Sequence, residues 1–234
     1  MKKYVNFDGV NFSEQTLVVG ETGTGKTENV VKPMVAELLR LKSKGSPVKV
    51  TVVEPQANVS LMVAEMARLL GLEHTHIDED LTDLENSFKN SDVLSIATGL
   101  GGDNSTNSFM YDLFQLEFLR EDDIPHFLIV EEFDKYINPD TELFLSLAKE
   151  QGVFCILTTQ SVSLLGVETG KFSAEAMKNS ILSNCRNKIL LTKAELKKKD
   201  EATRLFGEQA PFEKIISVCQ FVKGDALQEV QFGV

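Results

Sequence analysis

The apolar residues of this chain form short continuous runs that alternate with longer amphipathic stretches. The runs have the length of buried strands, and the longer stretches repeat their apolar positions every three to four residues, as amphipathic helices do. The runs lie at 16–19, 48–53, 93–96, 127–130, 153–157 and 189–191, and the helical stretches at 28–41, 61–70, 109–119, 141–149 and 174–182. Because strands and helices alternate, we predict an α/β fold with a mostly parallel central sheet flanked by helices.

A few segments depart from this alternation. Residues 77–90 are acidic and predict a surface excursion, and the glycine-rich stretch Gly99–Asn107 predicts a flexible loop. Later in the chain, residues 194–205 and 211–219 have helical patterns, and residues 227–232 predict an edge strand. Because no repeat, low-complexity tract or linker separates these elements, we predict one domain over residues 1–234.

Composition narrows the class of protein. The 234 residues are 42% hydrophobic and 25% charged, which is ordinary for a globular domain. A formal net charge of −11 argues against a broad basic face that coats nucleic acid, and leaves open contact through a few loops of a ring. No apolar run reaches the roughly 18 residues of a membrane span. Residues 1–8 lack the apolar region of a signal peptide, so we expect a cytoplasmic protein. Three scattered cysteines predict buried, reduced thiols.

One motif carries most of the functional information. Residues 20–27 read GETGTGKT and match G-x-x-x-x-G-K-[ST], the phosphate-binding P-loop, between a predicted strand and a predicted helix. Its glycines let backbone N–H groups turn toward phosphate oxygens, and the helix N-terminus adds partial positive charge. Lys26 is expected to reach the β- and γ-phosphates, and Thr27 to bind Mg²⁺. With ATP and Mg²⁺ as cofactors, the predicted binding residues are Gly20, Glu21, Thr22, Gly23, Thr24, Gly25, Lys26 and Thr27.

Two acidic residues follow the predicted strand at 127–130. Glu131 is expected to orient Mg²⁺, and Glu132 to polarise the attacking water, as in a Walker B motif. A second acid favours an ATPase over a kinase, because water needs a positioning group that a substrate hydroxyl does not. Glu131 stands where an aspartate is more usual, and its longer side chain would shift the geometry around the metal.

Two further residues are candidates for contact with the γ-phosphate. Gln160 follows a predicted strand, and would lie beside the γ-phosphate if that strand neighbours the strand of the P-loop. Charge on the transferring phosphoryl group commonly requires an arginine, often from a neighbouring subunit. The chain has five arginines, of which Arg186 is the first candidate, with Arg120 and Arg204 behind it.

Taken in order, these motifs resemble those of the FtsK/HerA superfamily of hexameric DNA-pumping ATPases. The resemblance covers about residues 15–192 and includes the P-loop, the segment 52–56, the acidic strand end 128–133, the block 147–161 and the segment 181–191. Four positions depart from the pattern of that superfamily, of which Glu54 and Gln56 are substitutions within the segment 52–56. Glu131 replaces the usual aspartate, and Lys149 falls where many members carry an arginine that is a candidate finger.

The resemblance implies a P-loop NTPase fold of the RecA-like, additional-strand type. It also implies a homo-oligomer, a hexameric ring with nucleotide sites between subunits, in which Arg186 or Lys149 would act in trans. The chain is close to the bare motor core, as are the genome-packaging ATPases of tailless, membrane-containing viruses. The implied function is therefore ATP-driven translocation of double-stranded DNA, in the host cytoplasm or at the virion vertex, with a portal or membrane-embedded partner protein.

Two other functions stay open from the sequence. The first is an energising or coupling ATPase of a type IV secretion or conjugation system. Residues 206–234 of this chain resemble the C-terminal tail of that group. The second is a nucleotide-dependent assembly module with little turnover, which Glu131 keeps open. A small-molecule kinase would need arginines clustered in a substrate pocket, and the five of this chain are dispersed.

Overall fold

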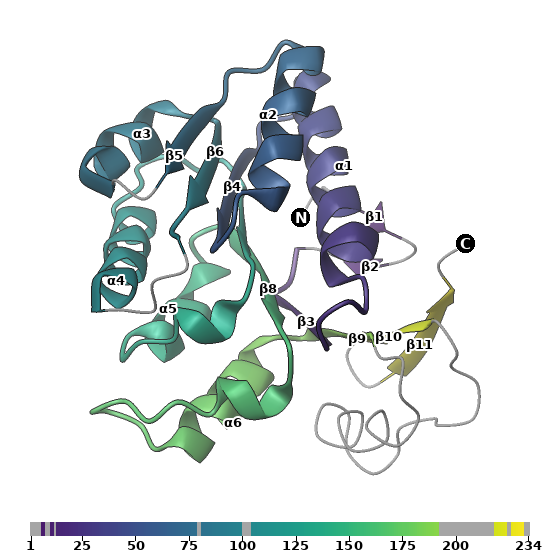
Figure 1. Cartoon of the computed structure of the whole chain (residues 1–234), viewed down its shortest axis with the longest axis vertical. Coiled ribbons are helices and arrows are strands. Elements are labelled where there is room, and N and C mark those ends of the chain that lie inside the picture. Colours follow the sequence, from purple (N-terminus) through teal and green to yellow (C-terminus); the bar gives the residue numbers. More distant parts are fainter. Residues whose placement is uncertain are drawn as a thin grey trace.

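A nine-stranded sheet forms the centre of the computed structural model, which describes residues 6–7, 10–11, 13–78, 81–99, 104–191, 218–223 and 226–231 (Figure 1). The strand order is β11-β10-β9-β3-β8-β7-β4-β6-β5. The parallel strands are β3 (Thr16–Gly20), β4 (Lys49–Glu54), β5 (Thr75–Asp78), β6 (Val93–Ala97), β7 (His126–Val130), β8 (Val153–Thr159) and β9 (Asn187–Leu191). The prediction of a mostly parallel sheet is therefore confirmed.

Two antiparallel additions complete the strands. β10 (Val218–Lys223) pairs with β9, and β11 (Ala226–Gln231) pairs with β10 and forms one edge of the sheet. Near the start of the chain, β1 (Asn6–Phe7) and β2 (Val10–Asn11) form a separate two-stranded sheet. The predicted edge strand at 227–232 thus corresponds to β11.

Helices cover both faces of the sheet, which gives three layers (Figure 1). On one face lie α1 (Lys32–Ser43) and α2 (Asn58–Leu70), whose apolar side chains pack against Val18, Val52 and Ile129 of the strands. On the other face lie α3 (Leu84–Asn90), α4 (Asn104–Phe118), α5 (Thr141–Ala148) and α6 (Ala174–Asn184), packed against Val19 and Leu128. Buried apolar strands between two helical layers explain the continuous apolar runs of the sequence.

Three predictions about the irregular segments need correction. The acidic segment 77–90 contains the strand β5 and the helix α3, which buries Leu84 and Phe88 in the core while its charges face outward. The predicted loop at 99–107 is shorter, because α4 begins at Asn104. The helix predicted for 211–219 is wrong at its end, where β10 begins at Val218. The helix predicted for 194–205 lies outside the described residues.

Several observations bear on cellular context and on the cysteines. Cys155 and Cys185 are buried free thiols, and burial raises the pKa of Cys185 to about 12. The side chain of Cys219 lies outside the described part. In the described part of the chain, no helix combines the length and apolar character that crossing a bilayer requires. The prediction of a single domain over the whole chain stays a prediction.

Candidate functional site

The P-loop joins the end of β3, in the middle of the sheet, to the start of α1. Gly23 and Gly25 have positive φ angles of 76° and 90°, which glycine adopts without strain. At Gly20 a Cβ atom would lie 2.6 Å from the carbonyl oxygen of Leu191, so the end of β3 packs too closely against β9 for a larger residue. Inside the loop, the backbone N–H and the hydroxyl of Thr24 donate to the Glu21 carbonyl, at 3.1 and 2.7 Å. Hydrogen bonds within the loop, both to the Glu21 carbonyl, therefore stabilise its turn.

Lys26 and Thr27 stand at the end of this loop, where the chain enters a π-helical turn (Thr27–Val31) that leads into α1. The Lys26 ammonium donates to the carbonyl oxygens of Gly20 and Glu21. Burial lowers the pKa of Lys26, and the nearby carboxylates of Glu131, Glu132 and Asp134 oppose that shift. The acids at the end of β7 therefore lie close to the P-loop lysine, as a shared phosphate and metal site requires.

Glu131 is a buried carboxylate with one oxygen in use and one free. Its Oε2 accepts a hydrogen bond from the Thr27 hydroxyl at 2.8 Å, whereas its Oε1 has no hydrogen-bond partner among the described residues. Burial raises the pKa of Glu131, and so do the neighbouring carboxylates of Glu54 and Glu132, while the Thr27 hydroxyl and the Lys26 ammonium lower it. A buried carboxylate oxygen without a partner, next to a threonine hydroxyl, suits a hard cation such as Mg²⁺.

The described residues hold no cluster of three His, Cys, Asp or Glu side chains that could cage a metal by itself. Magnesium commonly keeps several waters and shares its coordination with substrate phosphates, so two protein oxygens fit its usual mode of binding. The residues present therefore fit Mg²⁺ bound together with a nucleotide.

Glu132 has a conformation that no other described non-glycine residue shares, with φ 53° and ψ 47°. Its backbone N–H donates to the hydroxyl of Thr158 at 3.0 Å. Its side chain is about one-third exposed and pairs with Lys135 in the short helix η3 (Phe133–Lys135). The carboxylate is thus accessible to water at the tip of β7, as the role assigned to it from the sequence requires.

Gln160 follows directly after β8, which lies between β3 and β7. The condition set by the sequence is therefore met, because β8 neighbours the P-loop strand, with Val19 opposite Thr159. Gln160 is exposed at this edge, and Thr159 donates to Asp134 at 2.7 Å. The carboxyl ends of three adjacent strands therefore bring together the P-loop, the two acids and Gln160.

Glu54, at the end of β4, has a structural role at the same edge. Its carboxylate accepts backbone N–H bonds from Asn58, Val59 and Ser60, at 3.1, 2.9 and 2.6 Å, and a bond from the Ser60 hydroxyl at 2.6 Å. These are the free donors of the first turn of α2, so the glutamate of the segment 52–56 caps a helix.

The two basic residues considered as contacts to the γ-phosphate, Arg186 and Lys149, lie at the amino ends of the parallel strands, opposite the P-loop. Arg186 precedes β9 and Lys149 precedes β8, so both stand at the amino ends of parallel strands, whereas the P-loop stands at a carboxyl end. Lys149 pairs with Glu14 at 2.5 Å, and the Arg186 side chain is 70% exposed with its Nε 4.0 Å from Glu14. Since a strand rises about 3.3 Å per residue, neither side chain reaches the nucleotide site of its own subunit.

Arg120 is committed elsewhere, and Arg204 lies outside the described residues. The guanidinium of Arg120 is buried and bonds Glu117 at 3.2 Å and Asp122 at 2.8 Å. This arginine is therefore part of an internal ionic network at the amino edge of the sheet, where it cannot serve as a finger.

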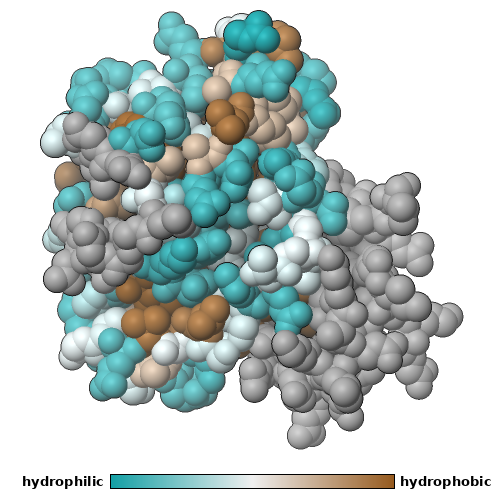
Figure 2. Space-filling view, viewed as in Figure 1, coloured by the Kyte–Doolittle hydropathy of each residue, from teal (hydrophilic) through white to brown (hydrophobic). Residues whose placement is uncertain are grey.

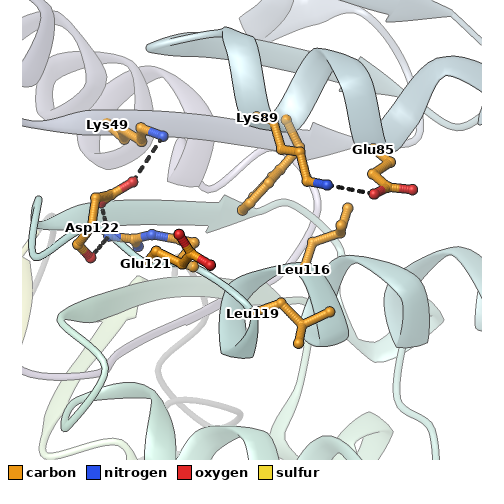
Figure 3. A pocket seen from close by; sticks show the side chains of 9 residues that line it. Lys49, Glu85, Lys89, Leu116, Leu119, Glu121 and Asp122 are labelled. Atoms are coloured by element: carbon orange, nitrogen blue, oxygen red, sulfur yellow. Dashed lines mark hydrogen bonds and ion pairs between the residues drawn. The ribbon is translucent and has the colours of Figure 1, made fainter.

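A cavity of about 350 Å³ lies beside that network, between α3 and the end of α4 (Figure 3). Its lining combines the ion pairs Lys49–Asp122 and Lys89–Glu85 with the apolar side chains of Leu116 and Leu119. The cavity shares no residue with the P-loop, the acidic pair or Gln160.

Sequence reasoning did not single out several residues of this edge. Thr158, Asp134 and Lys135 all contact the turn that carries Glu132 or the strand that carries Gln160. The pair of threonines at the end of an apolar strand was the available signal, because buried hydroxyls in a strand need partners.

Known proteins share this fold and part of this sequence. The family described as the TraM recognition site of TraD and TraG has a model that matches residues 125–214. The genome packaging NTPase B204 from Sulfolobus turreted icosahedral virus 2, solved in complex with ATP-gammaS, is similar with 12% identity and a TM-score of 0.64, covering 96% of this chain and 100% of that chain. VirB4 of Thermoanaerobacter pseudethanolicus follows with 13% identity and a TM-score of 0.62, over 96% of this chain and 93% of that one.

A third similar structure is the bacterial conjugative coupling protein TrwB, with 11% identity and a TM-score of 0.60, covering 100% of this chain and 89% of that chain. A comparison with curated protein sequences found no match. At these identities the structural likeness shows the fold, which is that of P-loop NTPases. The family model adds sequence similarity over less than half of the chain.

Proposed function

We propose that this chain is a P-loop ATPase of the FtsK/HerA type, a motor that hydrolyses ATP to translocate double-stranded DNA in the packaging of a viral genome. One observation carries the proposal: the similarity to a genome packaging NTPase spans 96% of this chain and all of the other. Support also comes from the site, because the P-loop, a buried acid, an exposed acid and a glutamine meet at one edge of the sheet.

Hydrolysis at this edge would divide the work among three side chains. Lys26 would exchange its contacts with the Gly20 and Glu21 carbonyls for contacts with the β- and γ-phosphates. Glu132 would accept a hydrogen bond from the attacking water and polarise it. Gln160 would align that water or sense the γ-phosphate from the end of β8. The reaction then depends on positioning and charge rather than on a covalent intermediate.

Thr27 and Glu131 would hold Mg²⁺ through the hydroxyl oxygen and the free Oε1. When bound, the ion supplies positive charge that balances the phosphate oxygens. The role of Glu131 is to keep a negative charge in a buried place, which its neighbours make unfavourable without a cation.

A ring would complete the site with a cation from the neighbouring subunit. Arg186 or Lys149 would act in trans, because each stands at the edge opposite the P-loop of its own subunit. The face next to Lys149 supports such a contact, since Leu143 and Leu147 of α5 are exposed. Figure 2 shows apolar side chains gathered on the surface near α5 and α6, and further apolar side chains over α2. A hexamer of this chain is the expected assembly.

A second candidate is an energising or coupling ATPase of a type IV secretion or conjugation system. The family model at residues 125–214 favours it, and so does the fold shared with VirB4 and TrwB. In that case the moved substrate would be a protein or a protein–DNA complex, and a membrane partner would dock on the chain.

The test is ATP turnover with and without long double-stranded DNA, for the wild type and for Glu132→Gln. The proposal predicts DNA-stimulated turnover that falls about 100-fold or more in the variant, because a positioned general base contributes at least that much. ATP binding should persist in the variant, as a nucleotide-dependent rise in melting temperature would report.

Each other outcome points to a different function. Turnover that is indifferent to DNA, in monomer and oligomer alike, would overturn the motor and favour the secretion ATPase. Bound ATP with no turnover in the wild type would favour an assembly module instead. Salt provides an independent check: few phosphates would be neutralised per subunit, so DNA affinity should fall only modestly with added salt.

A further inference from the structure

The backbone of Glu132 is held by a neighbouring strand. A left-handed conformation is unfavourable for a residue with a Cβ atom, and persists only where the surroundings fix it. Here the Glu132 N–H donates to the Oγ1 atom of Thr158, a residue that is fully buried. A buried threonine hydroxyl thus supports the one described non-glycine residue with positive φ.

Thr158 stands between the P-loop strand and the acidic turn. In the sheet it lies opposite Val18 of β3, and the preceding pair joins Leu157 to Val130 of β7. Side chains alternate along a strand, so Thr158 shares the face of Ile156, which packs in one cluster with the apolar side chains of α1. Its hydroxyl therefore bridges from β8 to the turn, on the side of the sheet where the nucleotide site opens.

The same turn is held a second time. Thr159 donates to Asp134 at 2.7 Å, so two consecutive hydroxyls of β8 bind the segment that carries Glu132. Gln160 follows at once, which ties the glutamine and the glutamate to one strand end. Burial lowers the pKa of the Lys26 ammonium, and the Glu132 charge is near enough to oppose that shift, which places Glu132 on the phosphate side of the edge.

We propose that Thr158 is a positioning residue for ATP hydrolysis, whose hydroxyl oxygen fixes the backbone of Glu132 so that the carboxylate meets the attacking water. The inference rests on the proposed function, which gives Glu132 its role. Thr158 acts only through Glu132. Valine has nearly the same shape and lacks the acceptor, whereas serine keeps it, so the two substitutions separate packing from hydrogen bonding.

The test compares Thr158→Val, Thr158→Ser, Glu132→Gln and the double variant Glu132→Gln/Thr158→Val. Thr51→Val is the matched control, since Thr51 is a buried strand threonine whose hydroxyl bonds His126 at 2.8 Å at the other edge. For each variant we would measure kcat, KM for ATP and the melting shift caused by ATP.

Thr158→Val should lose about ten- to hundredfold in kcat, because a small misplacement of a catalytic group has effects of that size. KM and the ATP-induced melting shift should stay within about twofold, since Lys26 and the P-loop are untouched. Thr158→Ser and Thr51→Val should match the wild type. In the Glu132→Gln background, Thr158→Val should cause no further loss, because both changes remove the same contribution.

Several results would overturn the inference. If Thr158→Val keeps the wild-type kcat while Glu132→Gln is inactive, the positioning role of Thr158 is rejected and the role of Glu132 stands. Additive losses in the double variant would mean that Thr158 acts elsewhere. Full activity in Glu132→Gln would instead reject the proposed role of Glu132. If Thr158→Val does not fold, Thr158→Ala takes its place: a loss in alanine that serine does not share supports the inference, and equal activity rejects it.

Discussion

The parallel strands of the central sheet begin at one side, the amino edge, and end at the other, the carboxyl edge. Both edges contain buried carboxylates, and the partners of these carboxylates differ between the two edges. At the amino edge, the buried Glu117 is paired with Arg120 at 3.2 Å and lies 2.7 Å from His126. Arg120 in turn bonds Asp122 at 2.8 Å, and Lys49 lies 3.2 Å from the same carboxylate. Positive and negative groups alternate there, so the charges compensate one another, even though Glu117 Oε1, Arg120 Nε and His126 Nδ1 have no partner with hydrogen-bond geometry among the described residues.

The carboxyl edge carries an excess of acid. Glu54, Glu131, Glu132 and Asp134 surround Lys26 and Lys135, and one oxygen of Glu131 has no partner among the described residues. The backbone is also less regular there, with the positive φ of Glu132 and a π-helical turn after the P-loop. Unbalanced charge and strained backbone are costly for stability, and they persist where a ligand completes them. The contrast indicates that the amino edge stabilises the fold and the carboxyl edge is built for a cation and phosphates.

The largest expected difference in ATP turnover between the two edges comes from replacing one lysine at each. Lys26→Ala should reduce ATP turnover at least about 100-fold, because it removes a charge aimed at the transferring phosphate. Lys49→Ala, the matched change at the amino edge, should leave turnover unchanged. Phosphate release at saturating ATP would measure both. Equal losses in the two variants would mean that the edges are not functionally distinct.

Breaking the ionic network at the amino edge should damage stability instead. Glu117→Gln removes one of the two carboxylates that pair with the buried Arg120 and leaves Asp122 as the other, so the free energy of unfolding should fall by about 2 kcal/mol. Turnover per folded molecule should be unaffected. Urea unfolding would measure the change, with the exposed Glu121→Gln as control, which should stay within about 0.5 kcal/mol of the wild type. An unchanged midpoint in Glu117→Gln would contradict a stabilising network.

Two glycines with similar φ angles, one inside and one outside the P-loop, test whether the P-loop backbone is needed for nucleotide binding. Gly25 and Gly45 have φ of 90° and 87°, so alanine at either should cost about 1–2 kcal/mol of stability. A Cβ at Gly25 would also overlap the side chain of Asn29, whereas one at Gly45 meets open space. Only Gly25→Ala should weaken nucleotide binding, which titration of the ATP-induced melting shift would show. Equal affinity in both variants would argue against the P-loop assignment.

The smallest expected effect is a gain in stability. Glu131→Gln should raise the free energy of unfolding of the nucleotide-free protein by about 1 kcal/mol, because it removes a buried negative charge of which only one oxygen has a hydrogen-bond partner. Burial raises the pKa of Glu131 above its ordinary value of 4.5, so the native state holds this proton to a higher pH than the unfolded chain. The cost to the wild type therefore develops as pH rises through that window.

Unfolding at several pH values would check this sign. The advantage of Glu131→Gln should vanish below the ordinary pKa of Glu131 and reach its full size above the raised pKa, while Mg²⁺-dependent turnover falls. Glu132→Gln serves as the control, because the partly exposed ion pair of Glu132 with Lys135 contributes little to stability. An advantage that grows as pH falls would show that Glu131 is stabilised by a partner.

Much of this arrangement could be predicted from the sequence, and the errors have identifiable causes. The P-loop and the acidic pair are local signals, because glycine spacing and the end of an apolar run mark them directly. The segment 77–90 was mistaken for surface because its many acids obscure two core residues, Leu84 and Phe88, at helical spacing. The start of α4 at Asn104 was missed because polar residues in a first helical turn resemble a loop.

The sequence alone determined the alternation of strands and helices, the phosphate-binding loop and the acids at the end of a strand, since each depends on neighbours along the chain. Only the tertiary structure decided which strand lies beside which. In that order the strand before Gln160 lies next to the P-loop strand, and the Thr158 hydroxyl lies beside the backbone of Glu132. Arg186 lies at the amino ends of the strands, away from the P-loop. Contacts between distant segments depend on how the whole core packs, and a local pattern of residues does not encode them.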